Sequence, residues 1–344
     1  MKLQLLLLLL FLSTLISCEN KIKETIAKKK VPDKYTLAFG SCNNQFTTNT
    51  LWKEILKNKP DIFIWGGDII YCDTYDMEFM KKNYIHQKND SSYMDFINQV
   101  ETIGTWDDHD YGINDGGVEY SKKDSVQQLF LDFFDIDQND PRRSQQGVYF
   151  SKKVRINEHL LNLIILDTRY FRSNLTKDPT GAKRYIPNKG GEGTFLGDNQ
   201  WNWLENELNN SNADFNIIMS SVQFLSYKHG FESWGTMPHE VKKLKNLIAD
   251  SNAKGVIILS GDRHIAEISV DSIPNITYPL IDITSSGLTH SYTSFKGEEN
   301  PYRIGNVVSN QNFGILNFDL TNNTITMEIR GESNKLYQTY TQKY

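Results

Sequence analysis

The sequence predicts an α/β fold, and three segments near its start are the basis of that prediction. The apolar runs YTLAFG, residues 35–40, and DIFIWGG, residues 61–67, are typical of buried strands. Between them, residues 49–59 place apolar side chains at helical spacing, and Pro60 follows. Strand, helix and strand in this order form the repeating unit of α/β proteins. At 344 residues and 39% hydrophobic content, the chain is long enough for a domain with a substantial core.

The next elements continue this pattern. Residues 76–99 have a helical character and lead to a third apolar strand over 100–106, which runs into an acidic cluster. Residues 121–136 predict a helix, and Ser121 is the residue expected to cap it. Strand ends followed by polar residues therefore recur through the first third of the chain.

The rest of the chain adds both strands and helices. Residues 147–171 predict a β-hairpin that turns near Asn157. Residues 171–197, rich in Gly, Pro, Asn and Lys, form a segment too long for a passive loop, so we expect it to overhang a site. The sequence then predicts a helix capped by Asp198 over 198–211, a strand over 215–224 and a helix that starts at Pro238 over 238–251. Further strands are predicted over 254–264, 281–290, 313–320 and 324–333.

Charge and composition exclude some classes of function. The net charge is −5, and the 37 basic residues are scattered, so the chain lacks the basic stripe of a nucleic-acid-binding domain. Nothing in the sequence indicates a protein partner. Three cysteines, Cys18, Cys42 and Cys72, are too few for a disulfide-built scaffold at this length.

The N-terminus predicts export. Residues 1–17 contain an early Lys and a short apolar run, as in a secretory signal peptide, and they end in LIS before Cys18. This is the pattern of a lipoprotein signal, in which Cys18 is lipidated; an ordinary signal peptide with a chance cysteine is the alternative. Residues 18–33 would then be a flexible tether to a single domain over 34–344. The expected location is the periplasmic or outer surface of a bacterial membrane, held by the lipid.

Unusual polar residues stand at four strand ends. Because loops from distant segments converge at the carboxyl ends of strands in α/β sheets, we expect these residues to meet. Carboxylates side by side repel one another, and metal cations would compensate that repulsion through oxygen, sulfur and imidazole ligands. The residues concerned are Cys42, then Asp68 with Tyr71, then Asp107, Asp108, His109 and Asp110, then Asp262 with His264.

The order of these motifs is similar to that of calcineurin-like metallophosphoesterases. GSC, WDDHD and GDRH replace the usual motifs of that superfamily, and together with Tyr71 in GGDIIYCD they resemble the PhoD-like phosphatases, the alkaline phosphatase D family. DTRYFR, FLGDNQWNWLENEL and SSVQF extend the resemblance over roughly residues 35–270. The resemblance implies a metallophosphoesterase-like β-sandwich of mixed sheets flanked by helices, a four-layer αββα arrangement.

The resemblance also implies a mixed centre of Fe³⁺ and Ca²⁺, with Zn²⁺ or Mn²⁺ as the alternative. A thiolate and a phenolate suit ferric iron, and carboxylates suit calcium. Carried over residue by residue, the iron ligands are Cys42, Asp68, Tyr71 and His264, with Asp68 bridging, and the calcium ligands are Asp108 and Asp262. A further ligand from the strand before QF is either Ser221 or Gln223.

The implied mechanism is attack on phosphorus by a metal-bound hydroxide. His109 is expected to stabilise developing charge or protonate the leaving oxygen, and Asp110 to orient His109 through a hydrogen bond. Arg169 either binds phosphate oxygens or forms a structural salt bridge under the long loop. We expect Arg263 to point away and Asp107 to be structural.

The predicted function is therefore that of an exported, lipid-anchored alkaline phosphatase and phosphodiesterase acting on phosphate esters. A phospholipase D-like or other phosphodiesterase of the same fold remains an alternative, because pocket loops set the substrate while the metals do not. A lipoprotein binding module without turnover is the non-enzymatic alternative. The sequence shows no missing ligand that would favour it.

Overall fold

Two mixed β-sheets form the centre of the computed structural model, which describes residues 33–344. The first sheet has the strand order β15-β14-β13-β1-β2-β3, in which β1, β2 and β3 are parallel and the other strands antiparallel. Its strands are β1 (Lys34–Gly40), β2 (Ile62–Gly66), β3 (Glu101–Thr105), β13 (Asn312–Asp319), β14 (Thr324–Gly331) and β15 (Leu336–Lys343).

The second sheet has the strand order β12-β10-β11-β9-β8-β5-β4. Strands β5, β8, β9 and β11 are parallel, and β4, β10 and β12 are antiparallel to their neighbours. The strands are β4 (Phe150–Ile156), β5 (His159–Ile165), β8 (Phe215–Met219), β9 (Val256–Ser260), β10 (Ala266–Asp271), β11 (Leu280–Ser285) and β12 (Arg303–Val308).

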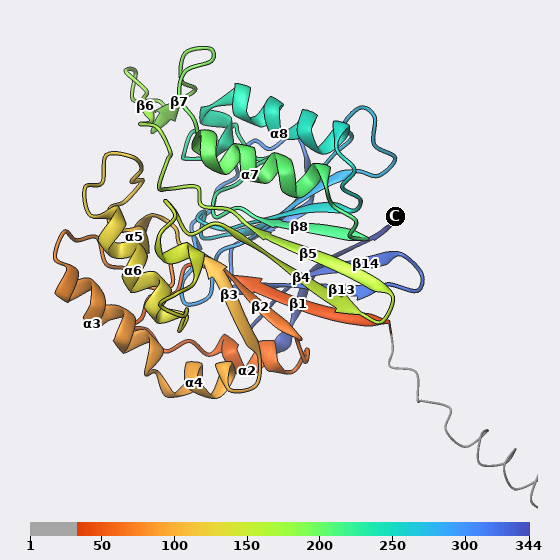
Figure 1. Cartoon of the computed structure of the whole chain (residues 1–344), viewed down its shortest axis with the longest axis horizontal. Helices are drawn as coiled ribbons and strands as arrows, with labels where there is room; N and C mark the ends of the chain where they lie inside the picture. The colour runs from red at the N-terminus through yellow and green to blue at the C-terminus, as the bar shows by residue number, and fades with distance from the viewer. Residues whose placement is uncertain (1–32) are drawn as a thin grey trace, which may run out of the picture. The chain divides into compact units, whose positions relative to one another are not determined.

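The two sheets pack face to face, and helices cover their outer faces (Figure 1). One apolar cluster joins residues of both sheets, among them Leu37 and Ile64 with Leu163 and Ile257. The first sheet is covered by α2 (Leu51–Leu56), α3 (Met77–Lys88), α4 (Ser91–Ile97) and α6 (Lys123–Phe133), and the second by α7 (Gly197–Asn209) and α8 (Pro238–Asp250). The predicted four-layer αββα sandwich of mixed sheets is confirmed.

Strand β2 shows how the sequence produces this layering. All five of its residues are buried, and successive side chains point to opposite faces. Ile62 and Ile64 enter the cluster between the sheets, whereas Phe63 and Trp65 enter the cluster beneath the helices. A strand buried on both faces reads as a continuous apolar run, which is why residues 61–65 could be recognised.

The helix starts differ from prediction in two places. Helix α6 begins at Lys123 after Lys122, and Ser121 makes no capping hydrogen bond. Helix α7 begins at Gly197, so Asp198 lies in its first turn instead of capping it. Helix α8 does begin at Pro238, as expected. The two failures share a cause, because a side chain can cap only if the backbone before the helix is extended, which the sequence does not specify.

Several elements were missed or merged by sequence reasoning. The predicted helical stretch 76–99 is two helices, because Asp90 interrupts it and caps α4 by accepting from the backbone N–H of Tyr93. Strands β10, β12 and β15 were not predicted, and the long segment 171–197 contains a ribbon of β6 (Thr176–Lys177) and β7 (Tyr185–Ile186). The hairpin of β4 and β5 turns at Asn157 and Glu158, as expected.

Residues Lys34–Tyr344 form one compact unit. The predicted signal peptide 1–17, the lipidated Cys18 and most of the tether 18–33 lie outside the described residues. Across residues 33–344, none of the helices combines the length and the apolar character needed to span a bilayer.

Candidate metal centre

The predicted ligands follow strands from both sheets and meet at one place. Cys42 follows β1, Asp68 follows β2, and Asp262 and His264 follow β9. These four residues have positive φ angles of 62°, 49°, 67° and 53°, respectively. Residues other than glycine rarely adopt this conformation, and when they do it is often at functional sites. The strained turns re-aim the side chains out of the sheets and into the space between the strand ends.

Four side chains form the first cluster. The Sγ atom of Cys42 lies 3.4 Å from Oδ2 of Asp68, and the hydroxyl of Tyr71 lies 3.1 Å from the same oxygen. The Tyr71 hydroxyl is also 3.0 Å from Nε2 of His264. Sulfur, carboxylate, phenol and imidazole donors thus surround one point, and Cys42, Asp68 and His264 offer ligand atoms within 4.8 Å of one another.

Two further clusters adjoin the first. Asp68, Asp108 and His109 bring ligand atoms within 4.8 Å of one another, and so do Asp107, Asp108 and Asp262. Asp68 belongs to the first and second clusters, and Asp108 to the second and third. The arrangement therefore offers ligand atoms for more than one cation, and Asp68 is shared by two of the clusters.

The buried acidic groups of this site favour the binding of cations. Burial, followed by the nearby Asp108, raises the pKa of Asp68 to about 8, and burial raises the pKa values of the Cys42 thiol and the Tyr71 phenol well above their usual range. Burial and Asp108 also raise the pKa of Asp262. These anions are costly without a compensating positive charge, and Oδ2 of Asp107 is buried without a hydrogen-bond partner. The donor set and its charge fit bound metal ions.

Asp108 is the exception among these carboxyl groups. Although burial alone would raise its pKa, Arg169, His109 and the backbone N–H of Asp115 lower the pKa of Asp108 to about 2. The Asp115 N–H donates to Oδ2 of Asp108 over 2.7 Å, and Asn114 donates to the same oxygen over 3.2 Å. Asp108 is thus ionised and oriented before any cation binds.

His109 lies beside the acidic cluster and is oriented by Asp73, not by Asp110. Its Nδ1 lies 2.8 Å from Oδ2 of Asp73. Burial alone would lower the pKa of His109, but the hydrogen bond to Asp73 and the charges of Asp68 and Asp108 raise it to about 11. In the metal-free site these contacts favour the protonated imidazole, the form that can donate a proton.

Asp110 has a different task from the one predicted. Its carboxylate accepts backbone N–H groups of Asp107, Asp68 and Ile69 over 2.6, 3.2 and 3.1 Å. The expected hydrogen bond to His109 is wrong, because these three donors occupy the carboxylate. Asp110 instead fixes the turns after β2 and β3, including the short helix α5 (Asp108–Tyr111).

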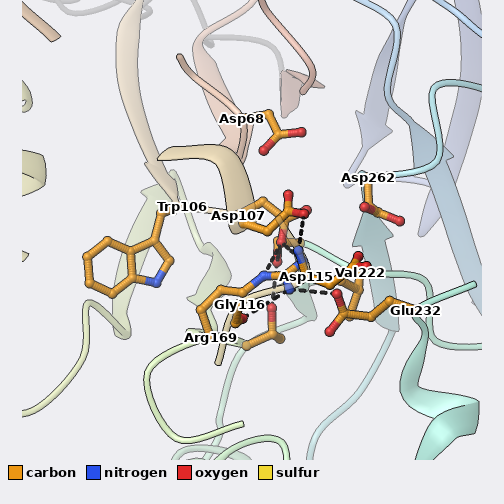
Figure 2. A network of polar contacts seen from close by, with 12 residues as sticks. Asp68, Trp106, Asp107, Asp115, Gly116, Arg169, Val222, Glu232 and Asp262 are labelled. Carbon is orange, nitrogen blue, oxygen red and sulfur yellow. Dashed lines mark hydrogen bonds and ion pairs between the residues drawn. The ribbon is translucent and has the colours of Figure 1, made fainter. Parts of the chain in front are cut away.

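Arg169 is entirely buried in a network of ion pairs (Figure 2). Its Nε donates to Oδ1 of Asp107 and its Nη1 to Oε2 of Glu232, both over 2.6 Å. Nη1 also donates to the carbonyl of Gly116 over 3.3 Å. Of the two expectations for Arg169, the structure favours the structural salt bridge. Its partner Asp107 was expected to be structural, but this ion pair was not predicted, and Asp107 also belongs to the third cluster.

The structure distinguishes Ser221 from Gln223. The Ser221 hydroxyl donates to Oδ1 of Asp107 over 2.7 Å, so it borders the acidic cluster. The Gln223 side-chain nitrogen donates to Glu267 and Thr284, both over 2.8 Å. Gln223 is thus part of a neighbouring buried network, and its candidacy as a ligand is not supported.

A cavity of about 470 Å³ opens over the clusters, and its lining includes Asp68, Asp108, His109, Asp262 and His264. Arg263 also lines it, contrary to the expectation that this side chain points away. Sequence reasoning missed the other lining residues: Asn114, Asp115, Arg184, Phe231, Glu232, Ser291 and Tyr292.

His290 was also missed. Its ring packs against those of Tyr71 and His264, at centroid distances of 5.0 and 4.5 Å. It follows β11 in the run SSGLTH, so the rule that strand ends carry site residues could have found it.

Comparisons with known proteins agree with this geometry. The family model of PhoD-like phosphatases matches residues 37–328. Alkaline phosphatase D of Bacillus subtilis (strain 168) is 23% identical over 279 residues, which is 67% of this chain but only 46% of that protein. This chain therefore spans about half the length of that relative.

Solved structures share the fold. One described as the structure of PhoD superposes with a TM-score of 0.74 at 17% identity, covering 91% of this chain and 70% of that one. A dimetal phosphatase from Danio rerio gives a TM-score of 0.51 at 11% identity, covering 90% of this chain and 99% of that one. Because the model of PhoD-like phosphatases matches residues 37–328, which is most of its length, this chain belongs to the PhoD-like phosphatase family.

Proposed function

We propose that this protein hydrolyses phosphate esters at a centre of Fe³⁺ and Ca²⁺. The observation that supports this most is the junction of two donor sets at Asp68. Cys42, Tyr71 and His264 form one cluster with Asp68, and Asp68 and Asp108 belong to the next. A thiolate and a phenolate suit a trivalent iron, and a group of carboxylates suits calcium, so the two clusters favour different ions.

Bound metals of this kind act as Lewis acids that activate water and neutralise charge on phosphoryl oxygens. The chain itself supplies the rest. The cavity places His109 beside Asp68 and Asp108, where a protonated imidazole can donate to the leaving oxygen or stabilise its charge. Asp73 fixes the ring through Nδ1, which leaves Nε2 as the proton-donating atom.

The scaffold around the ligands is preorganised. Asp110 holds the turns after β2 and β3, and the Arg169–Asp107 and Arg169–Glu232 ion pairs join three loops beneath the cavity. Rigid ligand placement favours catalysis, because the site need not reorganise when charge develops.

Export and lipid anchoring at Cys18 are part of this proposal. Their support is the signal-like run of residues 1–17 that ends in LISC. Mass spectrometry of the mature protein from its native membrane tests this point, with a lipid-modified Cys18 as the expected N-terminus and an unmodified N-terminus as the contrary result.

Hydrolysis of p-nitrophenyl phosphate and of bis-p-nitrophenyl phosphate tests the activity. The metal-loaded protein should hydrolyse at least one of these esters, and the ratio separates a monoesterase from a diesterase. A large excess for the bis ester would support the phosphodiesterase alternative. Absence of turnover for both esters, with full metal content, would support the non-catalytic binding module instead.

A further inference from the structure

The long segment 171–197 delivers a basic residue, Arg184, to the cavity. The ribbon of β6 and β7 projects from the side of the protein that carries α7 (Figure 1). Tyr185 anchors it at two points: its N–H donates to the carbonyl of Gly230, and its hydroxyl donates to Oδ2 of Asp115 over 2.6 Å. Asp115 and Phe231, the neighbour of Gly230, both line the cavity, so the ribbon is fastened to two of its walls.

The other arginines near the cavity are already engaged. Arg169 is fully buried between Asp107 and Glu232. The Nη2 of Arg263 donates to both carboxylate oxygens of Glu298 over 2.8 and 3.0 Å, and the side chain is only 9% exposed. Neither guanidinium can turn towards a substrate without abandoning a carboxylate.

Arg184 is in a different position. It also pairs with a carboxylate, Asp115, through Nη2, but its side chain is 47% exposed, whereas those of Arg169 and Arg263 are buried or nearly so. Its Nε makes a long contact of 3.4 Å with the Tyr185 hydroxyl. Because a guanidinium presents five N–H donors in a planar fork, these two contacts leave donors of Arg184 for a ligand in the cavity that it lines.

We propose that Arg184 binds a non-bridging oxygen of the substrate's phosphoryl group, an inference that rests on the proposed hydrolysis of phosphate esters. Arginine suits this task because its fork matches two phosphate oxygens. Five carboxylates line the same cavity, namely Asp68, Asp108, Asp115, Glu232 and Asp262, so an anionic ester needs fixed positive charge there in addition to the metals.

An indirect role for Arg184 predicts a different outcome. Arg184 contacts Asp115, and the Asp115 N–H donates to Asp108 over 2.7 Å. If Arg184 only positioned Asp108, its loss would lower metal content or kcat while leaving phosphate affinity unchanged. The Tyr185→Phe variant removes another contact to Asp115 but keeps the guanidinium. It therefore measures how much phosphate affinity depends on the contacts of Asp115 when Arg184 is present.

The test compares Arg184→Gln with Lys177→Gln in the full metal-loaded chain. Lys177 is exposed and pairs with Tyr185 in the same ribbon, so its replacement removes an equal charge away from the cavity. Binding of inorganic phosphate is measured by calorimetry, and KM and kcat are measured with a phosphate ester. We expect Arg184→Gln to weaken phosphate binding and raise KM about tenfold, as for loss of a charged hydrogen bond. Arg184→Lys should recover part of the loss, and Lys177→Gln should bind phosphate as the unaltered chain does. Tyr185→Phe, which removes one anchor of the ribbon but keeps the guanidinium, should weaken phosphate binding less than Arg184→Gln does.

Unchanged phosphate affinity in Arg184→Gln at equal metal content would overturn the proposal, as would equal weakening in Lys177→Gln. Failure of the metal-loaded protein to bind phosphate at all would also overturn it. A protein that binds phosphate but hydrolyses no ester would refute the proposed function alone, because the affinities of the variants would still decide the role of Arg184.

Discussion

The hydroxyl of Tyr71 lies 3.0 Å from Nε2 of His264, although the two residues are 193 positions apart in the sequence. Tyr71 belongs to the turn after β2 in the first sheet, and His264 to the turn after β9 in the second. The contact shows that the carboxyl ends of parallel strands from both sheets face one common site. Both residues also surround the point defined by Cys42 and Asp68, where we place the iron.

The two buried cysteines provide a matched pair of variants. Cys42 touches Asp68, whereas the thiol of Cys72 lies outside all three candidate clusters. Cys42→Ala should lose or shift the visible absorption of the iron centre and reduce activity at least tenfold, because a thiolate ligand is removed. Cys72→Ala should keep both. Absorption spectra at equal protein concentration measure this, and an unchanged spectrum in Cys42→Ala would remove Cys42 from the metal ligands.

Asp73 should control the alkaline limit of activity through His109. The active imidazole is protonated, so activity falls as the pH rises through its pKa, and Asp73 raises that pKa. Asp73→Asn should therefore shift the alkaline limb of the pH–kcat profile to lower pH. Asp135→Asn, which removes an exposed carboxylate paired with Lys88, serves as the control. An identical alkaline limb in Asp73→Asn and the unaltered protein would rule out this role.

Arg169 should matter for stability because its charge is buried. Arg169→Met leaves Asp107 and Glu232 without their shared partner, and loss of one member of a buried ion pair costs about 3–5 kcal/mol. Lys57→Met breaks the exposed pair with Glu54 and should cost less than about 1 kcal/mol. Urea unfolding gives both values. A loss below about 1 kcal/mol for Arg169→Met would mean that the network does not stabilise the fold.

Metal affinity should depend on pH in a defined direction. In the metal-free protein Asp68 keeps its proton below a pKa of about 8, and a ligand must lose its proton before it binds a cation. Binding should therefore release protons, and the affinity should fall as the pH is lowered from about 8 towards 6. Calorimetry in buffers of different ionisation enthalpy counts the released protons. No proton release at pH 7 would contradict the assignment of Asp68 as a ligand.

The sequence predicted the location of the site better than its contacts. Apolar runs that end at Cys42, Asp68 and Asp262 mark strand ends, and parallel strands bring such ends together regardless of loop detail. Sequence does not specify which of several nearby donors a carboxylate accepts. The carboxylate of Asp110 accepts three backbone N–H groups in the turns around it. The side chain that hydrogen-bonds to His109 is therefore Asp73 and not Asp110.

The positions of the arginine side chains also could not be predicted from the sequence. Arg263 follows β9 between two predicted ligands, and whether it faces the cavity depends on the positive φ angles of Asp262 and His264, which residue type does not reveal. Arg184 lies in a loop far along the chain from any predicted ligand. Its place in the cavity depends on the contacts of Tyr185 with two other loops, and such contacts leave no periodic pattern.

Tyr71 is the proposed tyrosinate ligand of ferric iron, and elemental analysis with visible spectroscopy of the natively expressed protein tests this assignment most directly. We predict iron and calcium in the purified protein and a purple to reddish colour from iron-bound tyrosinate. Tyr71→Phe should abolish the colour, while Tyr93→Phe, a buried tyrosine that contacts Trp65, should keep it. A colourless protein that contains zinc and is fully active would contradict the assignment of ferric iron and of Tyr71 as its ligand.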